Sequence, residues 1–258
     1  MTTEDRDHTS LVEPDEVGSL SSHASKKKHL PVWQETILLL GIALVLAVMI
    51  KAFFVQAFYI PSESMEPGLV KNDRILVQKV SYWLGGSPQR GDVVVFQDPG
   101  DWLGPEESAG PEGGLTQLMA TIGLYPSGGH LVKRVVGVAG DTIKCCDKQG
   151  RILVNGRPLN EESYVKSTGA DCNGPMIGCN WTAGPVPEGH LFVMGDNRAH
   201  SADSTVHLCT KSATDCVPGD EFVATDLVVG KVFVLLWPSD RFTFVHRPDT
   251  FADVPDAS

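Results

Sequence analysis

One long apolar run stands near the start of the chain and contains no charged residue between Ile37 and Ile50. With Thr36 and the residues up to about Gln56, it approaches the roughly 20 residues that an α-helix needs to cross a bilayer. The run is apolar on every side, which is typical of a membrane helix and unlike the amphipathic helix of a soluble domain. Residues 32–56 are therefore predicted to form a transmembrane anchor.

A cleaved signal peptide is the alternative interpretation of this run. Its charged region normally starts close to the N-terminus, and small residues form the cleavage site after the apolar core. Here a polar tail comes first, and Lys51 and Phe53-Phe54 follow the core, so an uncleaved anchor is favoured. Lys26-Lys27-Lys28 stand before the anchor, and excess positive charge marks the cytoplasmic side of a membrane helix. Residues 1–31 are accordingly predicted to be a disordered cytoplasmic tail.

Beyond the anchor, short runs rich in β-branched and aromatic residues alternate with Gly and Pro, a pattern typical of β-strands and turns. The fold is therefore predicted to be mostly β, with residues 57–248 forming a domain outside the membrane and residues 249–258 a C-terminal tail. Residues 98–129 are rich in Gly, Pro, Ser and Glu and predict a long flexible loop. The predicted strands are 75–80, 92–96, 130–138, 191–194, 227–237 and 242–246.

Net charge argues against one class of function. The 258 residues carry a formal charge of -11. A nucleic-acid-binding domain needs a concentrated basic surface, so no nucleic-acid partner is predicted.

The six cysteines bear on the compartment of the domain. Cys172 and Cys179 bracket a short loop, and so do Cys209 and Cys216, which suits local disulfides in an oxidising compartment. Other pairings stay open because six cysteines allow about 15 connectivities. The remaining two, Cys145 and Cys146, are adjacent. No C-x-x-C pair and no regular His spacing is present, so no metal site is predicted.

The segment Pro61-Ser62-Glu63-Ser64-Met65-Glu66-Pro67-Gly68-Leu69 places two serine hydroxyls directly after the anchor. A serine hydroxyl is a weak nucleophile until a neighbouring base activates it. Histidine is the usual base, but no histidine beyond the anchor lies in a Gly-x-Ser-x-Gly setting or beside an obvious aspartate partner. His200 is the best placed of them.

Lys133 is the alternative base. It lies in the apolar stretch Leu131–Val136, where strand alternation points Lys133 and Arg134 to opposite faces. A lysine on the packed face loses solvation, which lowers its pKa from about 10.4 toward neutrality. From the strand alone, a lysine on a solvated face is the more ordinary interpretation.

Five motifs follow one another along the chain. They are Pro61–Leu69, Asn72-Asp-Arg-Ile-Leu-Val-Gln-Lys79, Arg90-Gly-Asp-Val-Val-Val-Phe96, Val132-Lys-Arg-Val-Val-Gly-Val-Ala-Gly-Asp141 and Gly195-Asp-Asn-Arg-Ala-His-Ser-Ala-Asp-Ser204. In this order they resemble the five boxes of the bacterial type I signal peptidases, peptidase family S26, and the adjacent cysteines resemble an actinobacterial member. The resemblance covers roughly residues 33–246. This resemblance implies a signal-peptidase-type antiparallel β-sheet catalytic domain with a small inserted β subdomain at about 142–190.

The resemblance also implies a role for each matching residue. Ser64 corresponds to the nucleophile and Lys133 to the general base. The Ser62 hydroxyl and the Ser64 backbone N–H correspond to the oxyanion hole, and Ser201 to the serine that orients the lysine. These assignments imply a membrane-bound serine endopeptidase without a cofactor, which removes signal peptides from secreted preproteins after small-x-small sites.

Further residues correspond to supporting and substrate-binding positions. Asp196 matches the aspartate that pairs with Arg134, and Asp203 is a structural acid. Thr205 stands where the family usually has an arginine, so Asp203 is expected to lack its usual partner. Gly68 replaces a threonine and Ala139 a proline. The shallow pockets for small side chains are expected at Phe58, Ile60, Met65, Leu69 and Val132.

Two alternatives remain at this point. A Ser-Lys self-cleaving repressor-type protein would use the same chemistry, but the anchor and the Gly195–Ser204 motif argue against it. A membrane-tethered binding module that has lost catalysis belongs to a different class, and retention of both Ser64 and Lys133 argues against it. The predicted partners are therefore signal peptides, the lipid bilayer and the secretion translocon, at the plasma membrane.

Overall fold

The structure is a computed structural model that describes most of the chain. The described residues are 31–83, 85–100, 102–104, 113–114, 128–166, 172, 178–209 and 216–257. All but the last residue of the predicted tail 1–31, and most of the predicted loop 98–129, lie outside them.

Helix α1 is formed by Val32–Phe53 and contains the apolar run. Its segment Val32–Ile50 is long and apolar enough to cross a membrane. Glu35 lies in its first turn, where a carboxylate interacts favourably with the positive end of the helix dipole. The helix ends three residues before the predicted limit of the anchor at residue 56. Val55 and Gln56 belong instead to a strand, because their backbones pair with Gln78 and Val77.

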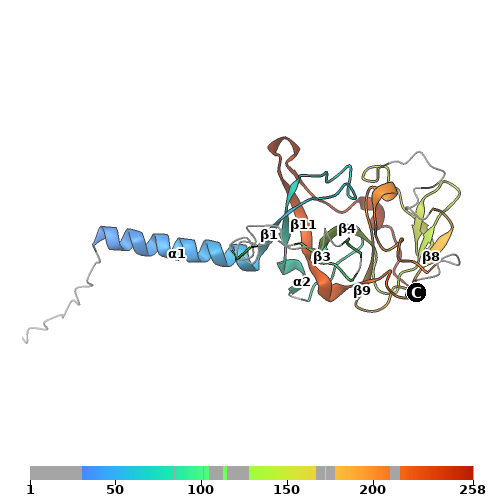
Figure 1. Ribbon diagram of the computed structural model, residues 1–258, viewed down its shortest axis with the longest axis horizontal. Helices are drawn as coiled ribbons and strands as arrows, with labels where there is room; N and C mark the ends of the chain where they lie inside the picture. Colours follow the sequence, from blue (N-terminus) through green and yellow to red (C-terminus); the bar gives the residue numbers. More distant parts are fainter. Residues whose placement is uncertain are drawn as a thin grey trace, which may run out of the picture. The chain divides into compact units, whose positions relative to one another are not determined.

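An eight-stranded antiparallel sheet forms the main part of the domain (Figure 1). Seven strands follow the order β1-β2-β11-β3-β4-β9-β10, and β12 pairs with β11. Their bounds are β1 Val55–Tyr59, β2 Arg74–Gln78, β3 Val93–Gln97, β4 His130–Gly137, β9 His190–Met194, β10 Val223–Ala224, β11 Val228–Trp237 and β12 Thr243–Phe244. Strand β4 lies inside the sheet between β3 and β9, so residues far apart in the sequence meet along it.

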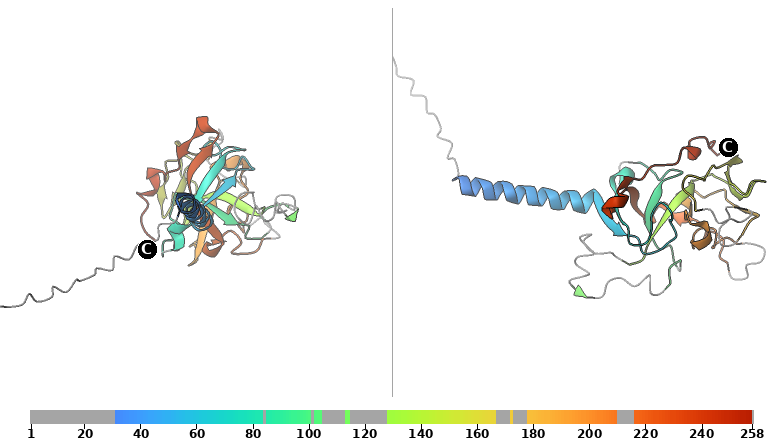
Figure 2. Two further views of the ribbon diagram at one scale, coloured as in Figure 1. Left: turned by 90° about the vertical axis from the view of Figure 1, so that its left-hand side faces the viewer. Right: turned by 90° about the horizontal axis from the view of Figure 1, so that it is seen from above.

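A second antiparallel sheet has four strands in the order β7-β6-β5-β8. The strands are β5 Ile143–Cys145, β6 Ile152–Val154, β7 Arg157–Pro158 and β8 Trp181–Ala183, all within the range 142–190 of the predicted subdomain. The turn between β6 and β7 contains Asn155 and Gly156, both with positive φ, which is the backbone conformation that an Asn-Gly hairpin turn requires. The views from the front and from above both show β8 at the end of the domain away from β1 (Figures 1 and 2).

Short helices connect the strands. The predicted strand 75–80 ends before Val80, where α2 begins. The short elements are α2 Val80–Trp83 and the 3₁₀ turns η1 Arg198–His200, η2 Thr225–Leu227, η3 Ser239–Arg241 and η4 Asp249–Phe251.

The apolar core consists of three clusters. One contains Met65 and packs β1, β2 and β11 together. Another consists of Trp102 packed against side chains of β3, β4 and β9. The third joins the second sheet to Phe192 and Met194 of β9. The buried side chains of this third cluster are supplied by the segments around β5, β6, β8 and β9 and by the C-terminal residues.

The C-terminal segment differs from the predicted tail. Phe251 and Val254 are buried in the cluster of the second sheet. The Asn155 amide donates a hydrogen bond of 2.9 Å to the carbonyl oxygen of Pro255. Residues 249–257 therefore pack against the domain, because burial of Phe251 and Val254 stabilises the packed position. These apolar residues stand among polar ones, so the segment has no apolar run that would have predicted its packing.

Candidate active site

Ser64 lies in the loop between β1 and β2, and its side chain is buried. Two backbone hydrogen bonds close the base of this loop: Ile60 N donates to Asp73 O and Asn72 N to Ile60 O, both at 2.9 Å. Within the loop, the Leu69 amide donates to the Met65 carbonyl oxygen at 3.0 Å. The loop therefore holds the serine as part of the folded core and not as a solvent-exposed tip.

Lys133 reaches Ser64 from strand β4. Its Nζ donates a hydrogen bond of 2.7 Å to Ser64 Oγ, and the lysine is only 4% exposed. The two residues are 69 positions apart in the sequence, and the pairing of β4 with β3 and β9 fixes the lysine backbone. The buried position is the one predicted for a general base, and it is unlike the solvated sheet face of the alternative interpretation.

Ser62 is the second hydroxyl of the loop. Its Oγ lies 3.2 Å from Ser64 Oγ, within hydrogen-bond distance. Ser62 is half-buried, whereas Ser64 is buried. One hydroxyl thus contacts the lysine amine directly, and the other stands beside it, nearer to solvent.

The loop after β9 closes over the other side of Ser64. A Cβ at Gly195 would overlap both the Ser64 carbonyl oxygen and Ser201 Oγ, so only glycine fits between them. The Asn197 backbone N–H donates to the Ser64 carbonyl oxygen at 3.0 Å, and its side-chain amide donates to the Glu63 carbonyl oxygen at 3.1 Å. No role was predicted for Asn197, although it lies in the motif Gly195–Ser204.

Ser201 is fully buried in the same loop, beside Gly195. The predicted hydrogen bond between its hydroxyl and Lys133 is not formed in this structure. Ser201 Oγ has no hydrogen-bond partner among the described residues. A buried hydroxyl without a partner is unfavourable, and this one lies next to the Ser64 backbone.

Arg134 forms the ion pair that the resemblance implied. Its guanidinium donates to both carboxylate oxygens of Asp196 at 2.8 and 2.6 Å, and a third bond of 2.9 Å runs to the Gly91 carbonyl oxygen. The guanidinium also lies over the Tyr164 ring, 4.6 Å from its centroid. Burial alone would lower the pKa of Arg134, but Asp196 outweighs it and the pKa is raised. The arginine therefore stays charged and fixes the start of the loop after β9.

A second buried ion pair, which sequence reasoning missed, links this loop to the segment before β8. Arg198 donates to Glu161 at 2.6 Å, and the two side chains are 1% and 0% exposed. The Tyr164 hydroxyl donates to the same carboxylate at 2.9 Å. Burial and the negative charge of Glu161 raise the pKa of Tyr164, so it remains a neutral donor. Glu161 carries no motif that could have indicated this role.

Asp203 has partners despite the missing arginine. One carboxylate oxygen accepts the Gly195 N–H at 2.9 Å. The other accepts both the backbone N–H and the hydroxyl of Thr205, at 3.1 and 2.6 Å. Thr205 stands in place of the family's usual arginine, and its hydroxyl and backbone N–H supply hydrogen bonds to Asp203 locally.

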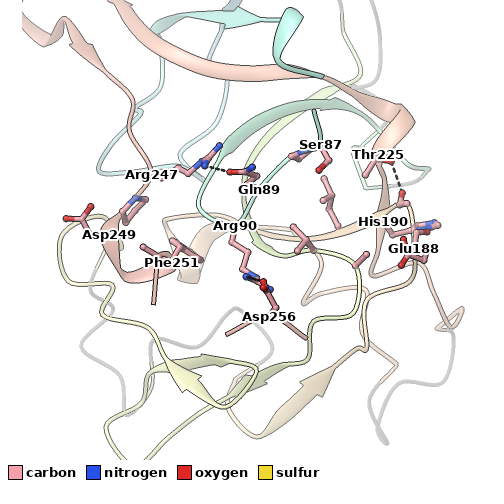
Figure 3. Close-up of a pocket in the computed structure, with 17 residues that line it drawn as sticks. Ser87, Gln89, Arg90, Glu188, His190, Thr225, Arg247, Asp249, Phe251 and Asp256 are labelled. Carbon is pink, nitrogen blue, oxygen red and sulfur yellow. Dashed lines mark hydrogen bonds and ion pairs between the residues drawn. The ribbon is translucent and has the colours of Figure 1, made fainter. Parts of the chain in front are cut away.

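The predicted pocket residues come together beside Ser64. Phe58, Ile60, Met65 and Leu69 are buried in one cluster, and Val132 packs against it while remaining partly exposed. Side chains of this kind offer an apolar surface without charge. A separate cavity of about 640 Å³ lies around Arg90 and His190 (Figure 3), and none of the predicted site residues lines it.

The geometry defines a class of site. A buried amine within hydrogen-bond distance of a serine hydroxyl can, once it is neutral, take the hydroxyl proton and so activate the oxygen as a nucleophile. A loop fixed by buried ion pairs holds the backbone around that hydroxyl. The class is that of a serine hydrolase.

Comparisons with known proteins identify the family. The family model described as signal peptidase, peptidase S26, matches residues 33–237. The signal peptidase I of Mycobacterium tuberculosis (strain CDC 1551 / Oshkosh) is 39% identical over 225 residues, which cover 83% of this chain and 75% of that protein. The probable signal peptidase I of Mycobacterium leprae (strain TN) is 35% identical over 255 residues, covering 89% of this chain and 86% of that protein. The chain therefore belongs to the signal peptidase family, peptidase S26, and is a serine peptidase of the signal peptidase I type.

A solved structure was also found. The crystal structure of a signal peptidase I from Enterococcus faecalis V583 is 22% identical to this chain, with a TM-score of 0.31. The match covers 56% of this chain and 95% of that chain.

Proposed function

We propose that the protein is a membrane-anchored serine endopeptidase that removes signal peptides from secreted preproteins with a Ser64–Lys133 dyad. The observation that carries this proposal is the 2.7 Å hydrogen bond between Lys133 Nζ and Ser64 Oγ, both in buried side chains. Burial disfavours the ammonium form of a lysine, and only the neutral amine can accept the serine proton.

In the first step, neutral Lys133 takes the proton from Ser64 Oγ as the oxygen attacks the scissile carbonyl carbon. The tetrahedral intermediate collapses, the C–N bond breaks, and the lysinium gives its proton to the leaving amine. Water then enters, loses a proton to Lys133 and attacks the acyl-enzyme ester. Ser64 leaves with that proton, which restores the dyad without a cofactor.

The negative charge of the intermediate needs hydrogen-bond donors. The Ser64 backbone N–H and the Ser62 hydroxyl are proposed to supply them, because Ser62 Oγ lies 3.2 Å from the attacking oxygen. Ser201 is proposed to orient Lys133. Its hydroxyl is buried and has no partner among the described residues, so it is available to the lysine amine during proton transfer.

The ion pair of Arg134 with Asp196 is proposed to hold this arrangement in place, with Asp203 supporting the loop. Arg134 follows the base directly in the sequence, and its three hydrogen bonds fix the strand at that point. Any change that frees the strand therefore moves Lys133 relative to Ser64.

Substrate choice is proposed to rest on the apolar cluster beside Ser64. Its residues are apolar and carry no charge, which favours small uncharged side chains such as those of Ala-x-Ala-like sites. The members of this proposed subsite are Phe58, Ile60, Met65, Leu69 and Val132.

The membrane part of the proposal rests on Val32–Ile50, which is long enough to span a bilayer. Lys26-Lys27-Lys28 favour a cytoplasmic N-terminus and a catalytic domain outside the plasma membrane. Signal peptides also lie in the bilayer, so confining enzyme and substrate to one surface raises their effective concentration. The secretion translocon, which delivers preproteins to that surface, is the proposed partner.

The test is cleavage of a preprotein by the full chain in detergent micelles. Ser64→Ala and Lys133→Ala are each expected to abolish processing. Ser239→Ala and Lys144→Ala change exposed residues of the same types and serve as matched controls. Wild-type rates in either dyad variant would contradict the proposal.

The pH profile provides a second check. The cleavage rate should rise with pH through a single ionisation as the lysine amine loses its proton. A rate that stays constant over that range would exclude a neutral amine as the base.

A further inference from the structure

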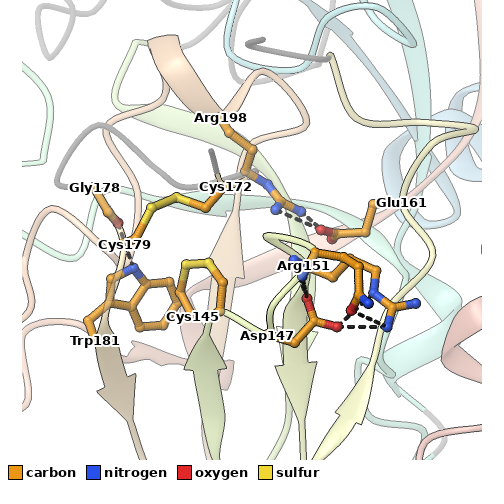
Figure 4. Close-up of a disulfide and its surroundings, with 11 residues drawn as sticks. Cys145, Asp147, Arg151, Glu161, Cys172, Gly178, Cys179, Trp181 and Arg198 are labelled. Atoms are coloured by element: carbon orange, nitrogen blue, oxygen red, sulfur yellow. Dashed lines mark hydrogen bonds and ion pairs between the residues drawn. A yellow bond between two sulfur atoms is a disulfide. The ribbon is translucent and has the colours of Figure 1, made fainter. Parts of the chain in front are cut away.

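Four of the six cysteines form one cluster of sulfur atoms. Their Sγ atoms all lie within 4.8 Å of one another. They are paired as the disulfides Cys145–Cys146 and Cys172–Cys179 (Figure 4). The first disulfide joins neighbouring residues at the end of β5, and the second closes a short loop.

The second sheet fixes the two disulfides beside each other. Cys145 is paired across the sheet with Trp181 of β8, and Cys179 precedes that tryptophan by two residues. The Trp181 indole N–H donates to the Gly178 carbonyl oxygen at 3.1 Å, which holds the residue next to Cys179. The proximity of the sulfur atoms is thus a consequence of strand register.

Each disulfide has one buried sulfur-bearing residue and one that solvent reaches. Cys145 and Cys172 are 0% and 5% exposed. Cys146 is half-buried, and Cys179 is exposed. A thiol in solution can therefore approach the cluster at Cys179, whereas the buried Cys172 has its sulfur within 4.8 Å of both sulfurs of the other disulfide.

We propose that these four cysteines form a thiol–disulfide exchange site that a small-molecule thiol enters at Cys179. A thiolate attacks Cys179 Sγ, forms a mixed disulfide there and releases Cys172 as a thiolate. Cys172 then attacks the Cys145–Cys146 bond, forms a disulfide with one of these sulfurs and releases the other as a thiolate. The entering thiol leaves again when a cysteine thiolate attacks the mixed disulfide, so pairing changes without net oxidation or reduction.

The third disulfide supplies an internal control. Cys209–Cys216 has the same sequence separation of 7 as Cys172–Cys179. Its sulfurs are not part of the four-sulfur cluster found among the described residues. When a thiol opens Cys209–Cys216, the cysteine thiolate that is released is not beside a disulfide of the four-sulfur cluster, so it cannot attack one.

The first experiment treats the full chain in micelles with one-tenth equivalent of reduced glutathione, then blocks thiols with N-ethylmaleimide and maps disulfides by mass spectrometry. The expected products join Cys172 or Cys179 to Cys145 or Cys146. At about 1 µM protein, a local concentration of order millimolar predicts these products to exceed cross-links between molecules by about a thousandfold. Native pairing throughout, with or without glutathione attached to Cys179, would overturn the proposal.

The second experiment needs no added thiol. Cys179→Ser leaves Cys172 as a thiol inside the cluster, and its attack should move the N-ethylmaleimide label to Cys145 or Cys146. The matched variant Cys216→Ser should keep the label on Cys209. A label that stays on Cys172 would refute the exchange, and the glutathione experiment on the wild-type chain tests it if Cys179→Ser does not fold.

Discussion

Removing one partner of the buried Arg198–Glu161 pair should destabilise the protein strongly. The two side chains are 1% and 0% exposed, so neither can recover hydration when its partner is lost. Breaking such a pair leaves an uncompensated charge and costs about 3–5 kcal/mol. For a domain of this size, 1 kcal/mol shifts Tm by roughly 2–4 °C, so Glu161→Leu should lower Tm by about 6–20 °C.

The same reasoning predicts recovery when both charges are removed. The Tyr164 hydroxyl also donates to Glu161, so the compensated variant is Glu161→Leu with Arg198→Met and Tyr164→Phe. Apolar residues of similar volume can replace a buried ion pair with little loss of stability. The triple variant should therefore be more stable than Glu161→Leu alone by about 2 kcal/mol or more.

Urea denaturation of the full chain in micelles, followed by tryptophan fluorescence, measures both effects. The exposed pair Arg157–Asp253, 54% and 68% exposed, is the control, and Asp253→Ala should change the free energy of unfolding by at most about 1 kcal/mol. One contrary result is that Glu161→Leu lowers the free energy of unfolding no more than Asp253→Ala does, and another is that the triple variant is the least stable of all. Either result would show that the buried ion pair does not hold the loop after β9.

Three further predictions concern the site and its support. Ser62→Ala should lower kcat by about a hundredfold with little change in KM, because it removes a proposed oxyanion donor; steady-state cleavage of a synthetic signal peptide measures this. Gly195→Ala should abolish cleavage and lower Tm, because its Cβ would overlap the Ser64 carbonyl oxygen, which cannot move freely. Burial raises the pKa of Asp92, but hydrogen bonds from Arg247 and Lys231 outweigh it and lower the pKa below 3.8. The unfolded chain therefore binds this proton more tightly, so the stability from Asp92 is present above pH 3.8 and is lost as pH falls through the folded pKa. Urea denaturation at several pH values should show that the free energy of unfolding of Asp92→Asn falls less steeply at acid pH than that of the wild type.

The local elements of the fold could be predicted because each depends on a short window of sequence. The run Ile37–Ile50 gave the helix, and the alternation around Lys133 gave β4 within one residue at its C-terminal end. The dipeptide Asn155-Gly156 is a strong hairpin signal, and β6 and β7 pair antiparallel around it. In each case the residues that determine the element lie inside it.

Other features depend on partners that no window contains. Strand β11 lies between β2 and β3, although more than a hundred residues of sequence separate β11 from each of these strands. Glu161 shows no motif, and its function arises only because folding brings it to Arg198. Ser64 and Lys133 could be linked in advance only through their resemblance to a family, since the strand alone favoured a solvated lysine.

The central position of β4 has a consequence for how the enzyme is made. Ser64 and Lys133 are 69 residues apart, and Arg134 is another 62 residues from Asp196. Non-local contacts of this kind form late because their loops must close first. A chain that is still being synthesised contains Ser64, the proposed nucleophile, before it contains Lys133, the proposed base, and it contains both before the loop after β9. Proteolytic activity should therefore appear only when the sheet is complete, which delays cleavage until the enzyme itself has folded.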